Sequence, residues 1–267
     1  MPIPLYDDSN YQELLNHPAP RLVMPRQTLY ASAEARECGL KPMSEFPDAL
    51  PAQSEWQAII EGCNTRKIFP VYHMREAGMM KYWNQDGLPY CWAWGLTGAV
   101  MIARVVAGQL PVLLNPVSLG WLVNWREEGY FLDRTIQGAK ERGIASAAVA
   151  PMSFNPRDHA QWPAGWEQDA LNYRALEWWD TDRAAGVVKM IAQCLAILAT
   201  GTPLYIAYNW WSHALECVGM RWDASKQNGI VWTIKNSHNE DDVIELADSK
   251  GVPDEAYGVR SVSWQVA

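Results

Sequence analysis

The pattern of apolar residues changes near Pro203, and this change limits the possible folds more than any other feature of the chain. Before Pro203 the apolar runs are long and helix-like, and the clearest of them, residues 91–107, is closed by Gly108, a typical helix C-cap. After Pro203 the apolar residues alternate with polar ones or gather in β-branched and aromatic runs, at 204–208, 214–222, 230–235 and 258–266. A helical half followed by an antiparallel half predicts an α+β fold.

Further helices are expected where capping residues open or close a run, at 52–61, 115–125, 133–142 and 182–199. The chain has 267 residues, of which 49% are apolar, enough to form the core of one two-lobed domain. Residues 1–68 are proline-rich and weakly periodic, and we interpret them as an extended leader or arm wrapped on the body. The body, 69–267, is expected to divide into a helical lobe at about 69–165 and a strand-rich lobe at about 166–267.

Charge and hydropathy exclude several classes of partner. The chain has 22 Lys and Arg against 30 Asp and Glu, which gives a net charge of −8. It contains no run of basic residues that could bind along a phosphate backbone, so nucleic acid is not expected as a partner. The uncharged stretches 105–125 and 190–215 are interrupted by glycine and proline, so no membrane-spanning helix is expected. Residues 1–10 lack the features of a secretory signal. We therefore expect a cytoplasmic location, or assembly into a particle, without export by a signal peptide.

The cysteines are five, an odd number, and none forms a closely spaced pair: Cys38, Cys63, Cys91, Cys194 and Cys217. This pattern argues against a zinc ribbon and against a fully paired disulfide framework, and neither a metal nor a cofactor is expected. Cys91 opens the predicted central helix, where the helix dipole and free amide groups stabilise a thiolate. A cysteine is most often a small buried apolar residue, so its chemistry must be judged from its neighbours.

Three short runs together hold the residue types that a nucleophilic cysteine needs: Asn84-Gln85-Asp-Gly-Leu-Pro-Tyr90-Cys91-Trp92-Ala93-Trp94, Ser212-His213-Ala214 and Lys235-Asn236-Ser237. In these runs the chain resembles the papain-like cysteine peptidases. His213 and Asn236 follow Cys91 by 122 and 145 positions, against about 130–150 in that family. Residues 114–119 and 201–207 also resemble family segments, so the resemblance covers about Phe69 to Val266.

The resemblance implies a papain-like two-lobe fold, with a central helix that begins at the nucleophile and an antiparallel, β-barrel-like second lobe. It assigns Cys91 as nucleophile, His213 as the base that becomes the general acid, and Asn236 as the residue that orients the imidazole. Gln85 is implied as an oxyanion donor beside the Cys91 amide. The expected activity is that of a cysteine endopeptidase acting on a peptide or protein substrate without a cofactor.

The chain departs from the family at one disulfide. Leu88 stands where the family has a half-cystine, and Pro89-Tyr90 replaces the Gly-Ser that precedes the nucleophile. The partner half-cystine is also missing, since the run that aligns with it is Glu127-Glu-Gly129-Tyr130. The joint absence agrees with a reducing compartment or a particle assembled in the cytosol.

Five residues are expected to contact substrate: Gly129, Tyr130, Trp211, Ser212 and Tyr90. Gly129 and Tyr130 align with a glycine pair that offers its backbone edge to an extended peptide in the family. Tyr130 and Trp211 predict a restricted, aromatic cleft that disfavours bulky substrate side chains. Core packing is the alternative interpretation of both rings.

Two further residues belong to the surroundings of the predicted site. Trp92 follows the nucleophile on the central helix. His238 stands where the family has a tryptophan that shields the histidine–asparagine hydrogen bond from water, so we expect this bond to be more exposed and the imidazole to be less firmly held.

Two other functions remain open from the sequence. The first is a papain-fold structural or interaction module with an idle or occluded site, for example in a phage particle, docked to the larger assembly through residues 1–68. The second is another acyl transfer, such as transglutamination or cleavage of cell-wall peptides, against which Asn236 and Gln85 argue.

Overall fold

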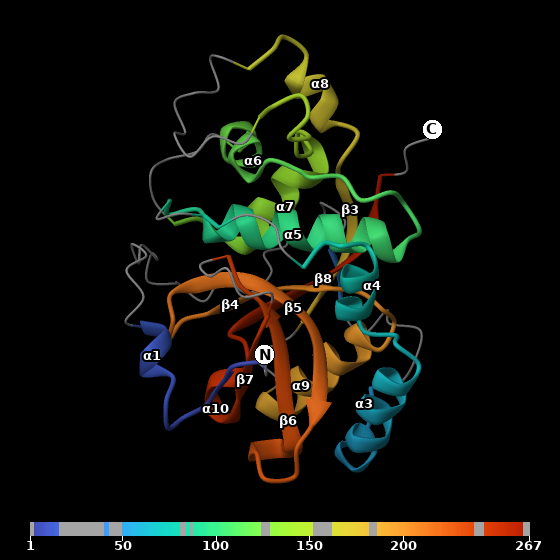
Figure 1. Ribbon diagram of the computed structural model, residues 1–267, viewed down its shortest axis with the longest axis vertical. Helices are drawn as coiled ribbons and strands as arrows, with labels where there is room; N and C mark the ends of the chain where they lie inside the picture. The colour runs from blue at the N-terminus through green and yellow to red at the C-terminus, as the bar shows by residue number, and fades with distance from the viewer. Residues whose placement is uncertain are drawn as a thin grey trace.

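One mixed sheet organises the fold in the computed structural model, which describes residues 3–15, 40–42, 50–80, 84–85, 88–123, 129–151, 162–181, 186–237 and 243–263. The eight strands of these ranges are ordered β1-β7-β6-β5-β4-β8-β3-β2 (Figure 1). Their bounds are β1 Leu5–Tyr6, β2 Leu40–Pro42, β3 Ala175–Asp180, β4 Leu204–Tyr208, β5 His213–Trp222, β6 Ile230–Lys235, β7 Ile244–Ala247 and β8 Glu255–Val262. Neighbours from β7 to β3 pair antiparallel, whereas β1 and β2 pair parallel with β7 and β3 at the two edges.

Helices lie on both sides of this sheet (Figure 1). They are α1 Gln12–Leu15, α3 Trp56–Thr65, α4 Pro70–Glu76, α5 Cys91–Val106, α6 Pro116–Leu122, α7 Leu132–Glu141, α8 Trp166–Ala170, α9 Val187–Leu198 and α10 Asp248–Gly251. The long helix α5 lies between the sheet and the helices α6 and α7, and α9 packs against β4, β5 and β8. None of the described helices is long and apolar enough to cross a bilayer.

Helix α5 is central because it is apolar on nearly every side. Its residues 91–104 are all buried, as expected for a helix covered on all faces. Gly95 allows α5 to approach β5 closely, since a Cβ there would lie 3.0–3.2 Å from the Tyr205 ring and the Leu215 backbone. The Tyr205 hydroxyl donates to the Trp92 carbonyl at 2.8 Å and ties the first turn of α5 to β4.

Several predicted elements agree with the structure. The strands expected at 204–208 and 230–235 coincide with β4 and β6, and the helix expected at 91–107 is α5. Asn115 caps α6 as expected, because its side chain accepts from the Val117 amide at 2.9 Å. Strands β3 and β7 were not predicted, and the expected helix at 182–199 begins at Val187 within the described residues.

The described parts of residues 1–68 pack against the body. Strand β1 extends the sheet beside β7, and α3 buries Trp56, Ile60 and Cys63 in the main core. These contacts support an N-terminal region that belongs to the fold. The domain boundaries near residues 68 and 165 stay predictions.

Candidate active site

The predicted base and its orienting amide meet where two neighbouring strands end. His213 opens β5 and Asn236 directly follows β6, and because these strands pair antiparallel, the two residues lie at the same end of the sheet. His213 Nε2 lies 3.0 Å from Asn236 Oδ1. An amide oxygen only accepts hydrogen bonds, so Nε2 carries the proton and Nδ1 is the nitrogen available for proton exchange elsewhere.

Cys91 stands at the first position of α5, directly after the N-cap Tyr90. Its thiol lies where the helix dipole favours negative charge. Gly95, one turn later, contacts the backbone of Leu215, which is two residues after His213. The close approach of α5 to β5 therefore brings the start of the helix near the strand that begins with His213.

Gln85 is buried and bound to the residue that follows Asn236. Its Oε1 accepts from the Ser237 hydroxyl at 2.6 Å, and its backbone amide donates to the Ser237 carbonyl at 2.9 Å. Its Nε2 donates to the Leu88 carbonyl at 2.7 Å. Because a carboxamide nitrogen carries two hydrogens, one donor remains for another acceptor. These bonds join the segment before Cys91 to the segment after Asn236.

Sequence reasoning assigned no role to Ser237, which binds Gln85, or to Gly95, which lets α5 approach β5. Ser237 is the last residue of the run that contains Asn236, and that position was the available signal. Gly95 interrupts an apolar helix, where a glycine costs stability unless a close neighbour requires it.

Aromatic residues surround the start of α5. The Tyr130 and Trp92 rings are 5.0 Å apart between centroids, and Tyr90 packs at 5.5 Å from Trp92. Tyr130 and Gly129 are half-buried. Tyr90 is fully buried, so a substrate contact by this ring requires movement. The roles of these three residues in substrate binding stay predictions.

Trp211 packs edge-on against His213, with the ring centroids 4.8 Å apart and the planes at 64°. Ser212, between them, is half-buried. The expected exposure of the histidine–asparagine bond is not found, because His213 is 4% and Asn236 3% exposed. Trp211, which was expected in the cleft, covers the imidazole. His238 lies outside the described residues.

The other described cysteines are, like Cys91, buried and not paired in a disulfide: Cys63, Cys194 and Cys217. Burial raises the pKa of the Cys63 and Cys194 thiols, and that of Cys217 to about 12. Cys38 lies outside the described residues. In the ranges that the structure covers, no group of three or more His, Cys, Asp or Glu side chains suits a metal ion.

Comparison with known proteins identifies the fold. No protein-family model and no curated protein sequence matches the chain. Solved structures do match. Digestive procathepsin L 3 of Tenebrio molitor larval midgut has a TM-score of 0.52 at 14% identity. The match covers 69% of this chain and 66% of the procathepsin, just under two thirds of its length. Xylellain, a cysteine protease from Xylella fastidiosa, has a TM-score of 0.50 at 18% identity, over 70% of this chain and 83% of xylellain.

A recombinant stem bromelain precursor also matches, with a TM-score of 0.52 at 17% identity, over 72% of this chain and 70% of the precursor. At such identities the likeness concerns the fold alone. The α+β papain-like fold expected from the sequence is confirmed.

Proposed function

We propose that this papain-fold protein is a cysteine-type peptidase that uses a Cys91–His213 pair oriented by Asn236. The observation that carries the proposal is the buried 3.0 Å contact between His213 Nε2 and Asn236 Oδ1, at the end of β5 that α5 approaches. Such a bond leaves Nδ1 to take the thiol proton. The presence of a cysteine protease among the structural neighbours supports the same chemistry.

In the proposed reaction, His213 Nδ1 takes the proton of Cys91 Sγ, and the thiolate attacks the carbonyl carbon of a peptide bond. When the C–N bond breaks, the imidazolium gives this proton to the leaving amine. Water then attacks the thioester with His213 as base, which releases the carboxylic acid and restores the thiol. Asn236 holds the ring in one tautomer throughout.

The oxyanion of each tetrahedral intermediate would be held by the Cys91 backbone amide and the remaining N–H of Gln85. The hydrogen bond from Ser237 fixes the oxygen end of the Gln85 carboxamide, and Leu88 takes one of its two hydrogens. The second hydrogen is thereby kept in a defined direction. A preorganised donor is effective because it needs no rearrangement as charge develops.

The test is turnover of a fluorogenic peptide library by the full chain, together with labelling by an epoxide inhibitor of thiol proteases. We expect Cys91→Ala to reduce turnover to background and to abolish labelling. Cys63→Ala, which removes another buried thiol on α3, is the matched control and should keep both. Turnover that survives in Cys91→Ala would exclude Cys91 as the nucleophile.

A second candidate function is a structural or interaction module with an occluded site, docked to a larger assembly through residues 1–68. The observation that favours it is the burial of Cys91, whose exposed fraction is 8%. It predicts no turnover and no epoxide labelling in the unmodified chain, whereas a peptidase requires both.

A further inference from the structure

The turn that leads into His213 is strained and depends on its neighbours. Ser212 has a φ of 55°, a left-handed conformation that non-glycine residues rarely adopt. Such a conformation persists only where surrounding contacts hold it. Within the turn, the Ser212 amide donates to the Asn209 carbonyl at 3.2 Å, and the Asn209 amide donates to Asp254 Oδ2 at 2.6 Å. The position of His213 therefore depends on what packs against residues 209–212.

A row of aromatic contacts runs from His213 to the N-terminal segment. Trp211 packs edge-on against His213, and Trp210 stacks on Trp211 with centroids 5.5 Å apart and planes at 14°. Tyr11, beside α1, meets Trp210 edge-on at 5.5 Å and 86°. Lys250 of α10 places Nζ 3.8 Å from the Tyr11 ring centroid and 5.3 Å from that of Trp210. Each ring is thus fixed by the next one outward.

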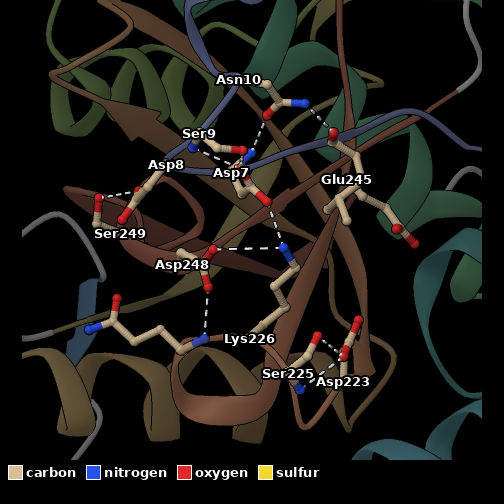
Figure 2. Close-up of polar contacts among 12 residues, drawn as sticks. Asp7, Asp8, Ser9, Asn10, Asp223, Ser225, Lys226, Glu245, Asp248 and Ser249 are labelled. Carbon is tan, nitrogen blue, oxygen red and sulfur yellow. Dashed lines mark hydrogen bonds and ion pairs between the residues drawn. The ribbon is translucent and has the colours of Figure 1, made fainter.

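Polar contacts fix the outer end of this row on the strand-rich part of the molecule (Figure 2). Lys226 Nζ lies 2.6 Å from Asp7 Oδ2, and the Ser249 hydroxyl donates to Asp8 Oδ1 at 2.6 Å. Asn10 closes the turn by accepting from the Asp7 amide at 2.8 Å. Strand β1 pairs with β7 in the same segment. Tyr11 is therefore presented by an anchored segment.

The hydrogen bond to Asn236 holds one atom of the imidazole. A second contact is needed to keep the ring from rotating about that atom. The edge-on contact with Trp211 supplies it, since it restricts the ring plane. Trp211 is buried, but Trp210 is only half-buried and relies on Tyr11 and Lys250 at its outer side.

We infer that residues 3–15 act as an internal positioning element for His213, with Tyr11 as the positioning residue that acts through Trp210 and Trp211. This inference rests on the proposed function, because it assumes that His213 forms a pair with Cys91. Loss of the Tyr11 ring loosens the imidazole and lowers the fraction of molecules with a thiolate–imidazolium pair.

The test is the rate at which iodoacetamide alkylates Cys91 in the full chain at pH 6 and at pH 9.5, followed by mass spectrometry of the Cys91 peptide. An unpaired thiol with a pKa near 8.5 is less than about 1% thiolate at pH 6, so reaction at pH 6 reports the pair, whereas reaction at pH 9.5 does not need it. The ratio of the two rates is therefore insensitive to general effects on accessibility. Thermal unfolding of every variant is recorded in parallel.

We expect Tyr11→Ala to lower the ratio of the pH 6 rate to the pH 9.5 rate about three- to tenfold. Tyr11→Phe should keep the wild-type ratio because the ring remains. Lys250→Gln should lower it about twofold, and this surface change keeps the inference testable if Tyr11→Ala unfolds. Arg260→Gln is the matched control. Arg260, on β8, also packs a cation over an aromatic ring, that of Trp179 at 4.6 Å, but this pair lies outside the row of rings from Tyr11 to His213.

The inference is overturned, and the proposed function is not, if wild-type Cys91 reacts at pH 6 and the ratio is unchanged in folded Tyr11→Ala and in Lys250→Gln. A wild-type Cys91 that reacts at pH 6 like an ordinary thiol would overturn the proposed function, and the inference with it. The two failures are thus distinguished by the wild-type chain.

Discussion

The two sides of the candidate site are held by different forces. On the helix side, Cys91 begins a helix held mainly by packing, beside the one hydrogen bond from Tyr205 to the Trp92 carbonyl. Trp92 and Trp94 are 1% exposed, and their indole N–H groups have no hydrogen-bond partner within the described part of the chain. On the strand side, hydrogen bonds join His213 to Asn236 and Ser237 to Gln85. Packing resists changes of volume, whereas hydrogen bonds resist loss of polar atoms, so each side is sensitive to a different kind of substitution.

On the helix side, a large effect is expected from Gly95→Ala. The added Cβ would meet the Leu215 backbone at 3.1–3.2 Å, so α5 must move away from β5. We expect the free energy of unfolding to fall by about 1–3 kcal/mol and peptidase activity to fall by about tenfold or more. Thermal unfolding and turnover of the fluorogenic peptides measure both.

Gly62→Ala is the matched control, because Gly62 lies in α3 and a Cβ there meets only the flexible end of Arg66 at 3.6 Å. We expect this variant to gain about 0.5–1 kcal/mol from helix propensity. If both glycine variants behave alike, the close approach of α5 to β5 is not what fixes the helix side.

Asn236→Ala tests the strand side. Without the amide oxygen, His213 Nε2 loses its 3.0 Å partner while the ring stays buried. We expect kcat to fall about 10- to 100-fold and the free energy of unfolding to fall by about 1–3 kcal/mol. Steady-state kinetics and chemical denaturation give the two values. A kcat within twofold of wild type would mean that the imidazole is held by packing on both sides.

Ser237→Ala is expected to have a smaller effect, since Ser237 acts through Gln85. Removing the hydroxyl frees Gln85 Oε1 and lets the carboxamide rotate. We expect kcat to fall about tenfold with little change in KM, less than the 10²–10³ that removal of an oxyanion donor costs. A double-mutant cycle with Gln85→Ala provides the check, because strictly additive effects would mean that the two residues act independently.

The smallest effect concerns a surface contact of the N-terminal segment. Hydrogen bonds from Lys226 and Ser9 lower the pKa of Asp7 to about 2 from its ordinary 3.8. A depressed pKa contributes stability that is complete above the unfolded value and is lost as the pH falls through about 2. We therefore expect Asp7→Asn to lower the unfolding temperature slightly and by a constant amount from pH 7 to pH 5.

The two unfolding temperatures should converge as the pH falls from about 4 to 2, where the wild-type carboxylate takes up its proton. Thermal unfolding across this range is the measurement. A difference of undiminished size at pH 2 would mean that the charge of the Asp7 carboxylate is not what stabilises the segment.

Much of the fold follows from local pattern. The short β-branched and aromatic runs of β4 and β6 and the long apolar run of α5 are patterns that a single segment contains. Strand β3 does not alternate regularly, since its sequence is Ala-Leu-Glu-Trp-Trp-Asp and its pairing with β8 shifts register near Glu177. Its pairing partners, not its own sequence, determine its conformation.

In the candidate site too, the local sequence indicates some features, whereas others depend on contacts between distant parts of the chain. His213, Asn236, Gln85 and Cys91 were identified from motif order, and the structure brings His213 to Asn236 and Gln85 to Ser237. Trp211 was expected in the cleft beside the predicted base, and its ring does pack edge-on against His213. The left-handed turn at Ser212 that leads into His213 was not foreseen. The contact between Tyr11 and Trp210 was also unforeseen, since 199 positions separate the two residues in the chain.

Both outermost strands of the sheet come from the first 42 residues, with β1 beside β7 and β2 beside β3. An uncovered strand presents unpaired N–H and C=O groups on which another chain can form a sheet. A chain that begins at residue 43 would expose β7 and β3 together, and such a molecule would be prone to aggregate at both ends of its sheet. We therefore expect removal of residues 1–42 to increase aggregation, because the edges it exposes are longer than β1 and β2.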